Sequence, residues 1–243
     1  MIRVTTFIAG LIASISSSAM AQDASQFQQE PPVVVELFTS QSCSSCVPAT
    51  EFLAELSEKR NVIVLGLHVD YWNTLNTRDG RWKDPYSSAA YTERQRQYNM
   101  NIRHRRSVYT PQMVINGTYE AVGSDRGNVL AMIEQSQTQM SPAPIAFETD
   151  GSRISFTIDP KDKGEAFLIS FKEVVDTDVR GGENAGVHFV DVNVVSNVDR
   201  LGSVGGQGAT FDVASPKEGY GCALIVQAPD QGRIINAAYC PAL

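Results

Sequence analysis

Residues 33–46 read VVVELFTSQSCSSC, and this stretch decides the fold of the chain. Its first six residues, 33–38, are apolar and rich in β-branched side chains apart from Glu36, which predicts a strand buried on both faces. From Cys43 onward the apolar residues recur at helical spacing, with Phe52, Leu53 and Leu56 on one face. The stretch therefore predicts a buried strand, a short polar turn, and a helix that opens with two cysteines.

The segments that follow extend this pattern into an α/β domain. Residues 62–69, VIVLGLHV, are typical of a second buried strand, and a strand, a helix and a strand in this order predict parallel pairing. Asn116-Gly117 is typical of a two-residue hairpin turn, and a last helix is predicted over 126–139. We expect an α/β domain over residues 33–140, interrupted by an insertion at 70–106. The insertion is predicted to contain a charged helix at about 86–102, with Asp84 as its N-cap and Pro85 in its first turn.

The character of the sequence changes after residues 141–144, Ser-Pro-Ala-Pro, which are predicted to form a linker. Residues 145–243 contain short apolar and β-branched runs separated by glycine-rich turns, and no helical period. The C-terminal half is therefore predicted to be an all-β, sandwich-like domain.

The beginning of the chain predicts its compartment. Arg3, the apolar run 7–15 and Ala19-Met20-Ala21 are typical of a secretory signal peptide, residues 1–21, followed by a flexible leader, 22–32. The mature protein would then be periplasmic or secreted, where disulfides persist. No later stretch approaches the roughly 20 apolar residues of a membrane span, so no stable membrane insertion is expected.

The composition narrows the class of partner. The 243 residues carry a formal net charge of -7. Nucleic-acid binding needs a basic face, so a nucleic-acid partner is not expected. A hydrophobic share of 42% is enough for a sizeable core.

The Cys43-Ser44-Ser45-Cys46 pair carries the predicted chemistry. A sulfur at a helix N-terminus is stabilised as thiolate by unpaired N–H groups and the helix dipole. Cys43 is therefore the predicted exposed nucleophile, and Cys46, one turn along, would resolve a mixed disulfide. Metal sites use the same spacing, so an alternative is copper or zinc bound by Cys43, Cys46 and His68.

The arrangement resembles the thioredoxin superfamily from about residue 33 to 139. The resemblance rests on the dithiol between strand and helix, on Thr110-Pro111 and on the hairpin at 116–117. It implies that Pro111 is cis, faces the dithiol, and binds the substrate backbone together with Thr110. It also implies that Glu36 is a buried proton acceptor for Cys46, although a solvent-facing glutamate is the alternative from the sequence alone.

More narrowly, the chain resembles a family of exported bacterial thioredoxin-like proteins of unknown function. The segments that carry this resemblance are 35–41, 68–72, 109–112 and 180–186. Two departures from ordinary thioredoxins stand out: Ser44-Ser45 lies between the cysteines, and the insertion 70–106 separates the dithiol from Pro111. Such an insertion would form a lid or a docking surface beside the thiols.

Two further cysteines, Cys222 and Cys240, flank a predicted hairpin that turns at 229–233. Pairing Ala228 with Ile234 sets residues 222 and 240 opposite each other, within the reach of a disulfide. We expect a structural disulfide there.

The sequence thus predicts an exported thiol–disulfide oxidoreductase-like protein. Its partners would be protein thiols or disulfides and a redox recycling partner, and no cofactor beyond the redox-active disulfide is expected. The alternatives are the metal-binding protein described above and a non-catalytic binding module that uses the β-rich half.

Overall fold

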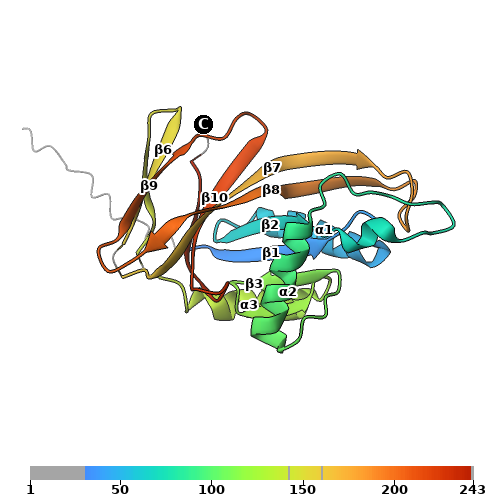
Figure 1. Ribbon diagram of the computed structural model, residues 1–243, viewed down its shortest axis with the longest axis horizontal. Coiled ribbons are helices and arrows are strands. Elements are labelled where there is room, and N and C mark those ends of the chain that lie inside the picture. The colour runs from blue at the N-terminus through green and yellow to red at the C-terminus, as the bar shows by residue number, and fades with distance from the viewer. Residues whose placement is uncertain (1–30, 142, 160, 242–243) are drawn as a thin grey trace, which may run out of the picture.

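The computed structural model describes residues 31–141, 143–159 and 161–241, and the account below concerns those residues (Figure 1). The helical elements are η1 (Ser44–Cys46), α1 (Val47–Ser57), η2 (Tyr71–Thr74), α2 (Ala89–Arg103) and α3 (Arg126–Gln137). The strands are β1 (Val33–Thr39), β2 (Val62–His68), β3 (Gln112–Ile115), β4 (Tyr119–Val122), β5 (Ala146–Thr149), β6 (Arg153–Ile158), β7 (Gly164–Asp178), β8 (His188–Val204), β9 (Ala209–Ala214), β10 (Tyr220–Gln227) and β11 (Ile234–Tyr239).

A large mixed sheet organises the molecule, with strand order β11-β10-β7-β8-β2-β1-β3-β4. β1 runs parallel to β2 with Val33 opposite Val62, and antiparallel to β3. Every residue of β1 and β2 is buried, which explains why both strands are almost continuously apolar in sequence. The α/β class predicted from the sequence is confirmed at this level.

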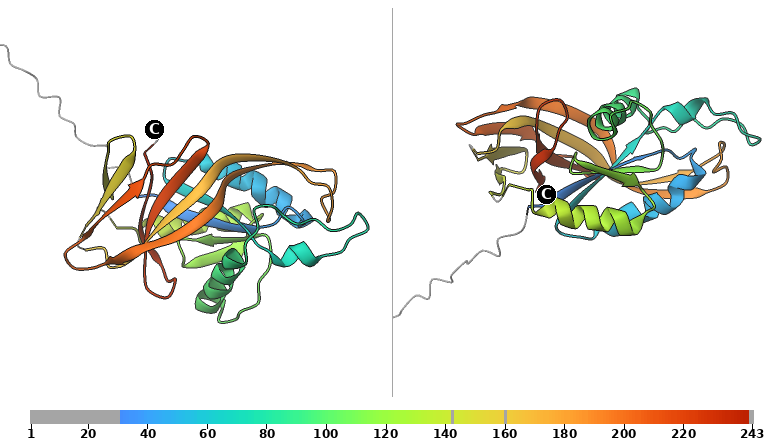
Figure 2. Two further views of the ribbon diagram at one scale, coloured as in Figure 1. Left: turned by 45° about the horizontal axis from the view of Figure 1, so that its top comes forward. Right: turned by 90° about the horizontal axis from the view of Figure 1, so that it is seen from below.

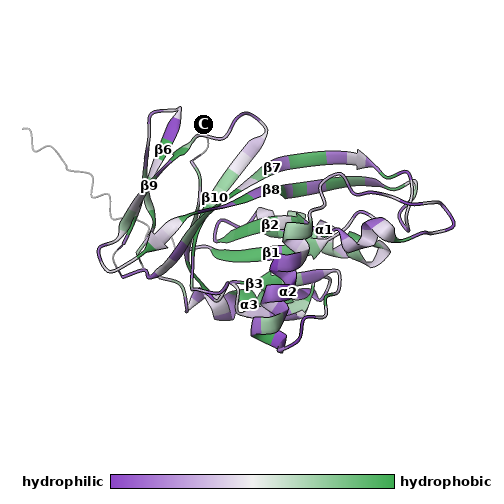
Figure 3. Ribbon diagram, in the orientation of Figure 1, coloured by the Kyte–Doolittle hydropathy of each residue, from purple (hydrophilic) through white to green (hydrophobic). Residues whose placement is uncertain are grey.

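The helices cover both faces of the sheet. In the two views of Figure 2, α1 and α3 lie on one face and α2 crosses the other. α1 buries Phe52, Leu53 and Leu56 against the strands, as its spacing predicted. The hydropathy colouring shows the apolar centre in β1, β2 and β3, with a largely hydrophilic α2 outside it (Figure 3). The main core therefore lies on both sides of the N-terminal strands.

The C-terminal half is joined to this sheet, and here the structure differs from the prediction of a separate sandwich-like domain after a linker at 141–144. β7, β8, β10 and β11 extend the sheet beyond β2. The junction has one backbone residue pair, Gly66 with Val194. Side chains complete it: Asn193 Nδ2 donates to the Val64 carbonyl at 3.0 Å, and the Val64 N–H donates to the Tyr239 hydroxyl at 3.0 Å. The free edge of β2 has polar backbone groups that need partners, and these contacts supply them.

A smaller sheet, β5-β6-β9, forms the second layer of the C-terminal half. Its buried residues Ile154, Phe156 and Ile158 belong to one apolar cluster with Leu224 and Val226 of β10. The β-strand content and face-to-face packing expected for residues 145–243 are therefore present, but one of the two layers belongs to the large sheet.

The insertion at 70–106 contains η2, an irregular loop and α2. The sequence placed the helix at about 86–102 with Asp84 as its N-cap. The helix instead begins at Ala89 with Ser88 as its N-cap, whose side chain accepts from the Ala90 N–H. One oxygen of Asp84 accepts from the Tyr86 N–H in the loop, while the other accepts from the Gln41 N–H outside the insertion.

No helix among residues 31–141, 143–159 and 161–241 has the length and apolar character that crossing a membrane requires. The predicted signal peptide, 1–21, and all but the last two residues of the predicted leader, 22–32, lie outside the described residues.

Candidate functional site

The dithiol lies between β1 and α1, at the carboxyl end of β1. Cys43 and Cys46 form a disulfide with their Cα atoms 5.3 Å apart. Cys43 is extended (φ -100°, ψ 109°) and precedes η1, which continues directly into α1. The Cys46 N–H donates to the Cys43 carbonyl at 3.1 Å. Cys43 thus occupies the N-terminus of the combined helix, as predicted.

The loop before β3 faces the first sulfur. The Thr110–Pro111 peptide bond is cis, in agreement with the prediction. The Thr110 hydroxyl donates to Cys43 Sγ at 3.3 Å, and the Trp72 indole N–H donates to the same hydroxyl oxygen at 2.7 Å. An indole nitrogen only donates, so it leaves the hydroxyl hydrogen of Thr110 free to point at the sulfur.

Both sulfurs are buried, which corrects one expectation. The sequence predicted Cys43 to be exposed, but Cys43 and Cys46 have 0% of their surface accessible, while Ser44 and Ser45 between them are exposed. Three segments contact Cys43: the Ser45 hydroxyl lies 3.4 Å from its sulfur, Thr110 bonds that sulfur, and the Asn184 amide bonds its carbonyl. A substrate therefore reaches Cys43 only if at least one of these segments moves.

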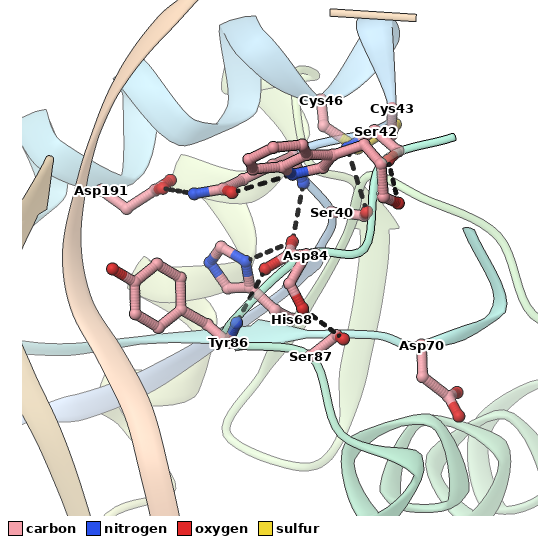
Figure 4. A network of polar contacts seen from close by, with 12 residues as sticks. Ser40, Ser42, Cys43, Cys46, His68, Asp70, Asp84, Tyr86, Ser87 and Asp191 are labelled. Atoms are coloured by element: carbon pink, nitrogen blue, oxygen red, sulfur yellow. Dashed lines mark hydrogen bonds and ion pairs between the residues drawn. A yellow bond between two sulfur atoms is a disulfide. The ribbon is translucent and has the colours of Figure 1, made fainter. Parts of the chain in front are cut away.

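The turn that carries the dithiol rests on a buried polar network, drawn in Figure 4. The Gln41 N–H donates to Asp84 Oδ2 at 2.9 Å, and the same oxygen lies 2.8 Å from His68 Nδ1. The Gln41 side chain donates to Asp191 at 3.1 Å and accepts from the Trp82 indole at 3.2 Å. The insertion and β8 thus hold Gln41, two residues before Cys43, and His68 of β2 reaches Gln41 only through Asp84.

Charge accompanies these hydrogen bonds. Burial of the imidazole opposes its charged form, but the carboxylates of Asp84 and Asp191 outweigh that cost and raise the pKa of His68 to about 9. Burial opposes ionisation of Asp84 as well, yet the His68 charge lowers the pKa of Asp84. Burial raises the pKa of Asp191. A pKa of about 9 makes His68 an imidazolium at neutral pH, paired with the Asp84 carboxylate.

Glu36, the predicted proton acceptor, is fully buried and occupied by other partners. Arg94 of α2 donates to both carboxylate oxygens, at 2.7 Å from Nε and 3.2 Å from a terminal nitrogen. The Tyr98 hydroxyl also donates to Glu36, and Gln227 of β10 donates to Tyr98 at 2.9 Å. This ion pair joins β1 to α2 and gives the Glu36 carboxylate a structural role; no contact with a cysteine is present.

His68 of the alternative metal set is likewise engaged with Asp84 rather than with the cysteines, which are bonded to each other. Within residues 31–141, 143–159 and 161–241 no group of three or more His, Cys, Asp or Glu side chains is arranged to hold a metal ion.

The second disulfide, Cys222–Cys240, joins the ends of β10 and β11. The register places Ala223 opposite Tyr239, so residues 222 and 240 face each other as predicted. The predicted pair of Ala228 and Ile234 is wrong by one residue because a bulge after Val226 pairs Gln227 with Ile234. Cys222 belongs to the second apolar cluster, with 3% of its surface exposed.

A family model described as "Protein of unknown function (DUF1223)" matches residues 34–227, from β1 to the end of β10. The chain belongs to the DUF1223 family. No curated protein matches it significantly.

Two solved structures are similar to this DUF1223 protein. The X-ray structure of a protein from Agrobacterium tumefaciens superposes with a TM-score of 0.73 at 28% identity, covering 87% of this chain and 95% of that one. The structure of HBP35 of Porphyromonas gingivalis superposes with a TM-score of 0.57 at 14% identity, covering 87% of this chain and 75% of that one. The second similarity concerns the fold alone.

The family match also spans residues that sequence reasoning did not assign to the site. Residues 179–187 join β7 to β8 and contact the dithiol turn through Glu183 and Asn184. The segment 180–186 carries part of the family resemblance, and the glycines in it are the one local signal of a turn. Its position beside Cys43 follows only from the order of strands in the sheet.

Proposed function

We propose that this DUF1223 protein is an exported thiol–disulfide oxidoreductase with a thioredoxin-like N-terminal half. The observation that carries the proposal is the position of Cys43: its sulfur lies at the start of the helix and 3.3 Å from the Thr110 hydroxyl, next to a cis-proline. Helix N–H groups and a hydroxyl donor both favour a thiolate over a thiol.

The reaction can be written in the reducing direction. The Cys43 thiolate attacks one sulfur of a substrate disulfide, forms a mixed disulfide and releases the other substrate sulfur as a thiolate. Cys46 then loses its proton and its sulfur attacks Cys43 Sγ, which forms the Cys43–Cys46 bond and releases the second substrate thiolate. Two electrons pass to the substrate, and a partner dithiol returns the pair to its reduced form. The oxidising reaction is the same sequence reversed.

The other proposed site residues act around this exchange. Pro111 and Thr110 would align the substrate backbone, as the resemblance implies. The Glu36–Arg94 pair is better suited to holding α2 on β1 than to taking a proton from Cys46, since both oxygens of Glu36 are bonded. The predicted signal peptide supports an exported location, and the two disulfides fit an oxidising compartment.

A trapping experiment tests the proposal. In Cys46→Ser, the Cys43 thiol has no resolving partner, so incubation with a protein disulfide should accumulate a mixed disulfide visible by non-reducing electrophoresis. Cys43→Ser is the matched control and should form none at this site. If Cys46→Ser forms no mixed disulfide, or forms it equally when Cys43 is also replaced, the proposed function is wrong.

A further inference from the structure

The loop between β7 and β8, residues 179–187, lies against the dithiol turn. In all views of Figures 1 and 2 it reaches the same end of the molecule as the turn after β1. Glu183 Oε2 accepts from the Ser44 N–H at 3.0 Å and from the Ser44 hydroxyl at 2.8 Å. The buried Asn184 amide donates to the Gln41 carbonyl and the Cys43 carbonyl, both at 3.0 Å. Two adjacent residues of this loop therefore hold both sides of Cys43.

The loop is closely seated, and its glycines permit that approach. A Cβ at Gly181 would lie 2.6 Å from the Arg81 carbonyl, and one at Gly182 would lie 2.9 Å from the Ser42 hydroxyl. Gly182 and Gly186 both have left-handed backbone conformations, with φ of 77° and 86°. They flank Glu183 and Asn184, so the segment that touches the dithiol has a conformationally permissive residue on each side.

The contact made by Glu183 depends on the redox state of Cys43. In the disulfide, Cys43 carries no charge, and the Ser44 N–H at the helix N-terminus attracts the carboxylate. Reduction by a dithiol breaks the Cys43–Cys46 bond, converts the dithiol to its disulfide and transfers two electrons. Of the two protons that the reducing dithiol gives up, Cys46 takes one and the other goes to solvent, since Cys43 is left as a thiolate. The thiolate and Glu183 then compete for the same end of the helix, and like charges repel.

We propose that residues 179–187 form a charge-operated lid on the dithiol, closed over the disulfide and released by the Cys43 thiolate, with Glu183 as its latch and Asn184 as its anchor. The inference rests on the proposed function, because it describes how the same dithiol is regulated. A closed lid slows the attack of unselective thiols on the oxidised pair, and an open lid presents the reduced nucleophile to a bulky protein substrate. The buried sulfur of Cys43 is explained as the oxidised, closed state.

Hydrogen–deuterium exchange tests the lid without requiring catalysis. The amides of Gly182, Gly186 and Val187 are bonded to Gly80, Val179 and Asn184 in the closed loop. We expect their exchange in the wild-type protein to accelerate about fivefold when dithiothreitol reduces the Cys43–Cys46 disulfide. Alkylation of the free thiols verifies that reduction is complete. Because Glu183 is exposed, the acceleration should shrink in 1 M NaCl.

Substitutions separate the charge from the contact. Glu183→Gln keeps an acceptor for Ser44 without the charge, so its loop should exchange at the same rate in both redox states. Asn184→Ala removes the anchor, so the amides of its loop should exchange quickly in both redox states. Glu165→Gln, which removes the negative charge that faces Arg200 at the opposite end of β7, is the matched control and should behave as wild type.

The proposal is overturned if wild-type exchange does not respond to reduction, or if Glu183→Gln responds as wild type does. Turnover of a protein disulfide is measured separately. If the loop opens on reduction but the protein shows no turnover, the proposed function is wrong and the lid proposal stands. If the protein shows turnover but the loop does not respond to reduction, the lid proposal is wrong and the proposed function stands.

Discussion

The two disulfides of this protein are both withdrawn from solvent, Cys43–Cys46 completely and Cys222–Cys240 in part, but they lie in different surroundings. Cys43–Cys46 spans three positions at a helix N-terminus, with hydroxyls near its first sulfur and a charged network beneath its turn. Cys222–Cys240 spans eighteen positions across a strand pair and belongs to an apolar cluster. Burial therefore gives no basis for the proposed difference between a reactive pair and a structural one. The donors and charges around the sulfur give one, because only they stabilise a thiolate.

The largest difference between the pairs should appear in catalysis. Cys43→Ser should reduce the turnover of a protein disulfide by dithiothreitol to the uncatalysed rate, because no thiolate remains at the helix N-terminus. The double variant Cys222→Ser/Cys240→Ser should retain turnover. Rates are measured with equal concentrations of folded protein, checked by circular dichroism. Turnover that depends on Cys222 or Cys240 instead would reverse the assignment of the two pairs.

For stability we expect the opposite order: the Cys222–Cys240 disulfide should contribute more to the free energy of unfolding than the Cys43–Cys46 disulfide. The Cys222–Cys240 bond closes the longer loop, and by chain entropy it should contribute about 3 kcal/mol to the free energy of unfolding. The Cys43–Cys46 bond closes a four-residue loop and should contribute about 2 kcal/mol or less. Urea unfolding of Cys222→Ala/Cys240→Ala and Cys43→Ala/Cys46→Ala at neutral pH compares the two. A larger loss from the second variant would show that the dithiol turn is also the stronger structural tie.

The charged network predicts a pH dependence that the apolar cluster lacks. His68 has a folded-state pKa of about 9 against an ordinary value of 6.5. The contribution of His68 to the free energy of unfolding is complete below pH 6.5 and is lost as the pH rises to about 9. On the order of 2 kcal/mol of stability should disappear over that interval.

The measurement for His68 is urea unfolding of the oxidised protein at pH 6.5 and pH 9.5. His68→Gln should be less stable at pH 6.5 and should show a flatter pH dependence between these values. If the stability of His68→Gln falls between pH 6.5 and pH 9.5 as steeply as that of the wild type, another group is responsible for the pH dependence.

The smallest effect concerns the hydroxyl beside the sulfur. Thr110→Val removes the donor to Cys43 Sγ while keeping the shape of the side chain. The rate of iodoacetamide alkylation of the reduced protein at pH 7 should fall about fivefold, the effect of one hydrogen bond of roughly 1 kcal/mol. Thr157→Val, an exposed substitution in β6, is the control. Equal rates in wild type and Thr110→Val would remove Thr110 from the set of residues that favour the thiolate.

The sequence predicted those parts of the fold that local patterns specify. Continuous apolar runs identified β1 and β2, helical spacing identified α1, and Asn116-Gly117 identified a turn in which both residues have positive φ. The hairpin register placed Cys222 opposite Cys240 because pairing in a hairpin depends only on nearby residues. The dithiol is itself a short segment, whereas the cis state of Pro111 was implied by the resemblance to the thioredoxin superfamily.

The parts that escaped prediction depend on pairings between distant residues. Glu183 and Ser44 are 139 positions apart, and Glu36 and Arg94 are 58 apart. No periodicity in the sequence reports which side chain will neutralise a buried glutamate. The exposed Cys43 was a wrong expectation for the same reason, since the distant residues that contact it come from the loop before β3 and from the loop between β7 and β8. The order of the strands in the large sheet also escaped prediction, because β7, β8, β10 and β11 join the sheet of β1 and β2 through pairings between distant residues.

The junction between β2 and β8 gives the two halves an unusual mechanical relation. One backbone residue pair crosses it, and the amide of Asn193 and the hydroxyl of Tyr239 complete it. A ladder with many backbone bonds would fix the registration of the halves regardless of side chains. Here two side chains supplement the single backbone pair, so a substitution at position 193 or 239 weakens the tie between β2 and β8 directly. The loop that contacts the dithiol leads into β8, so such a change can reach the cysteines with every residue around the sulfurs left as it is.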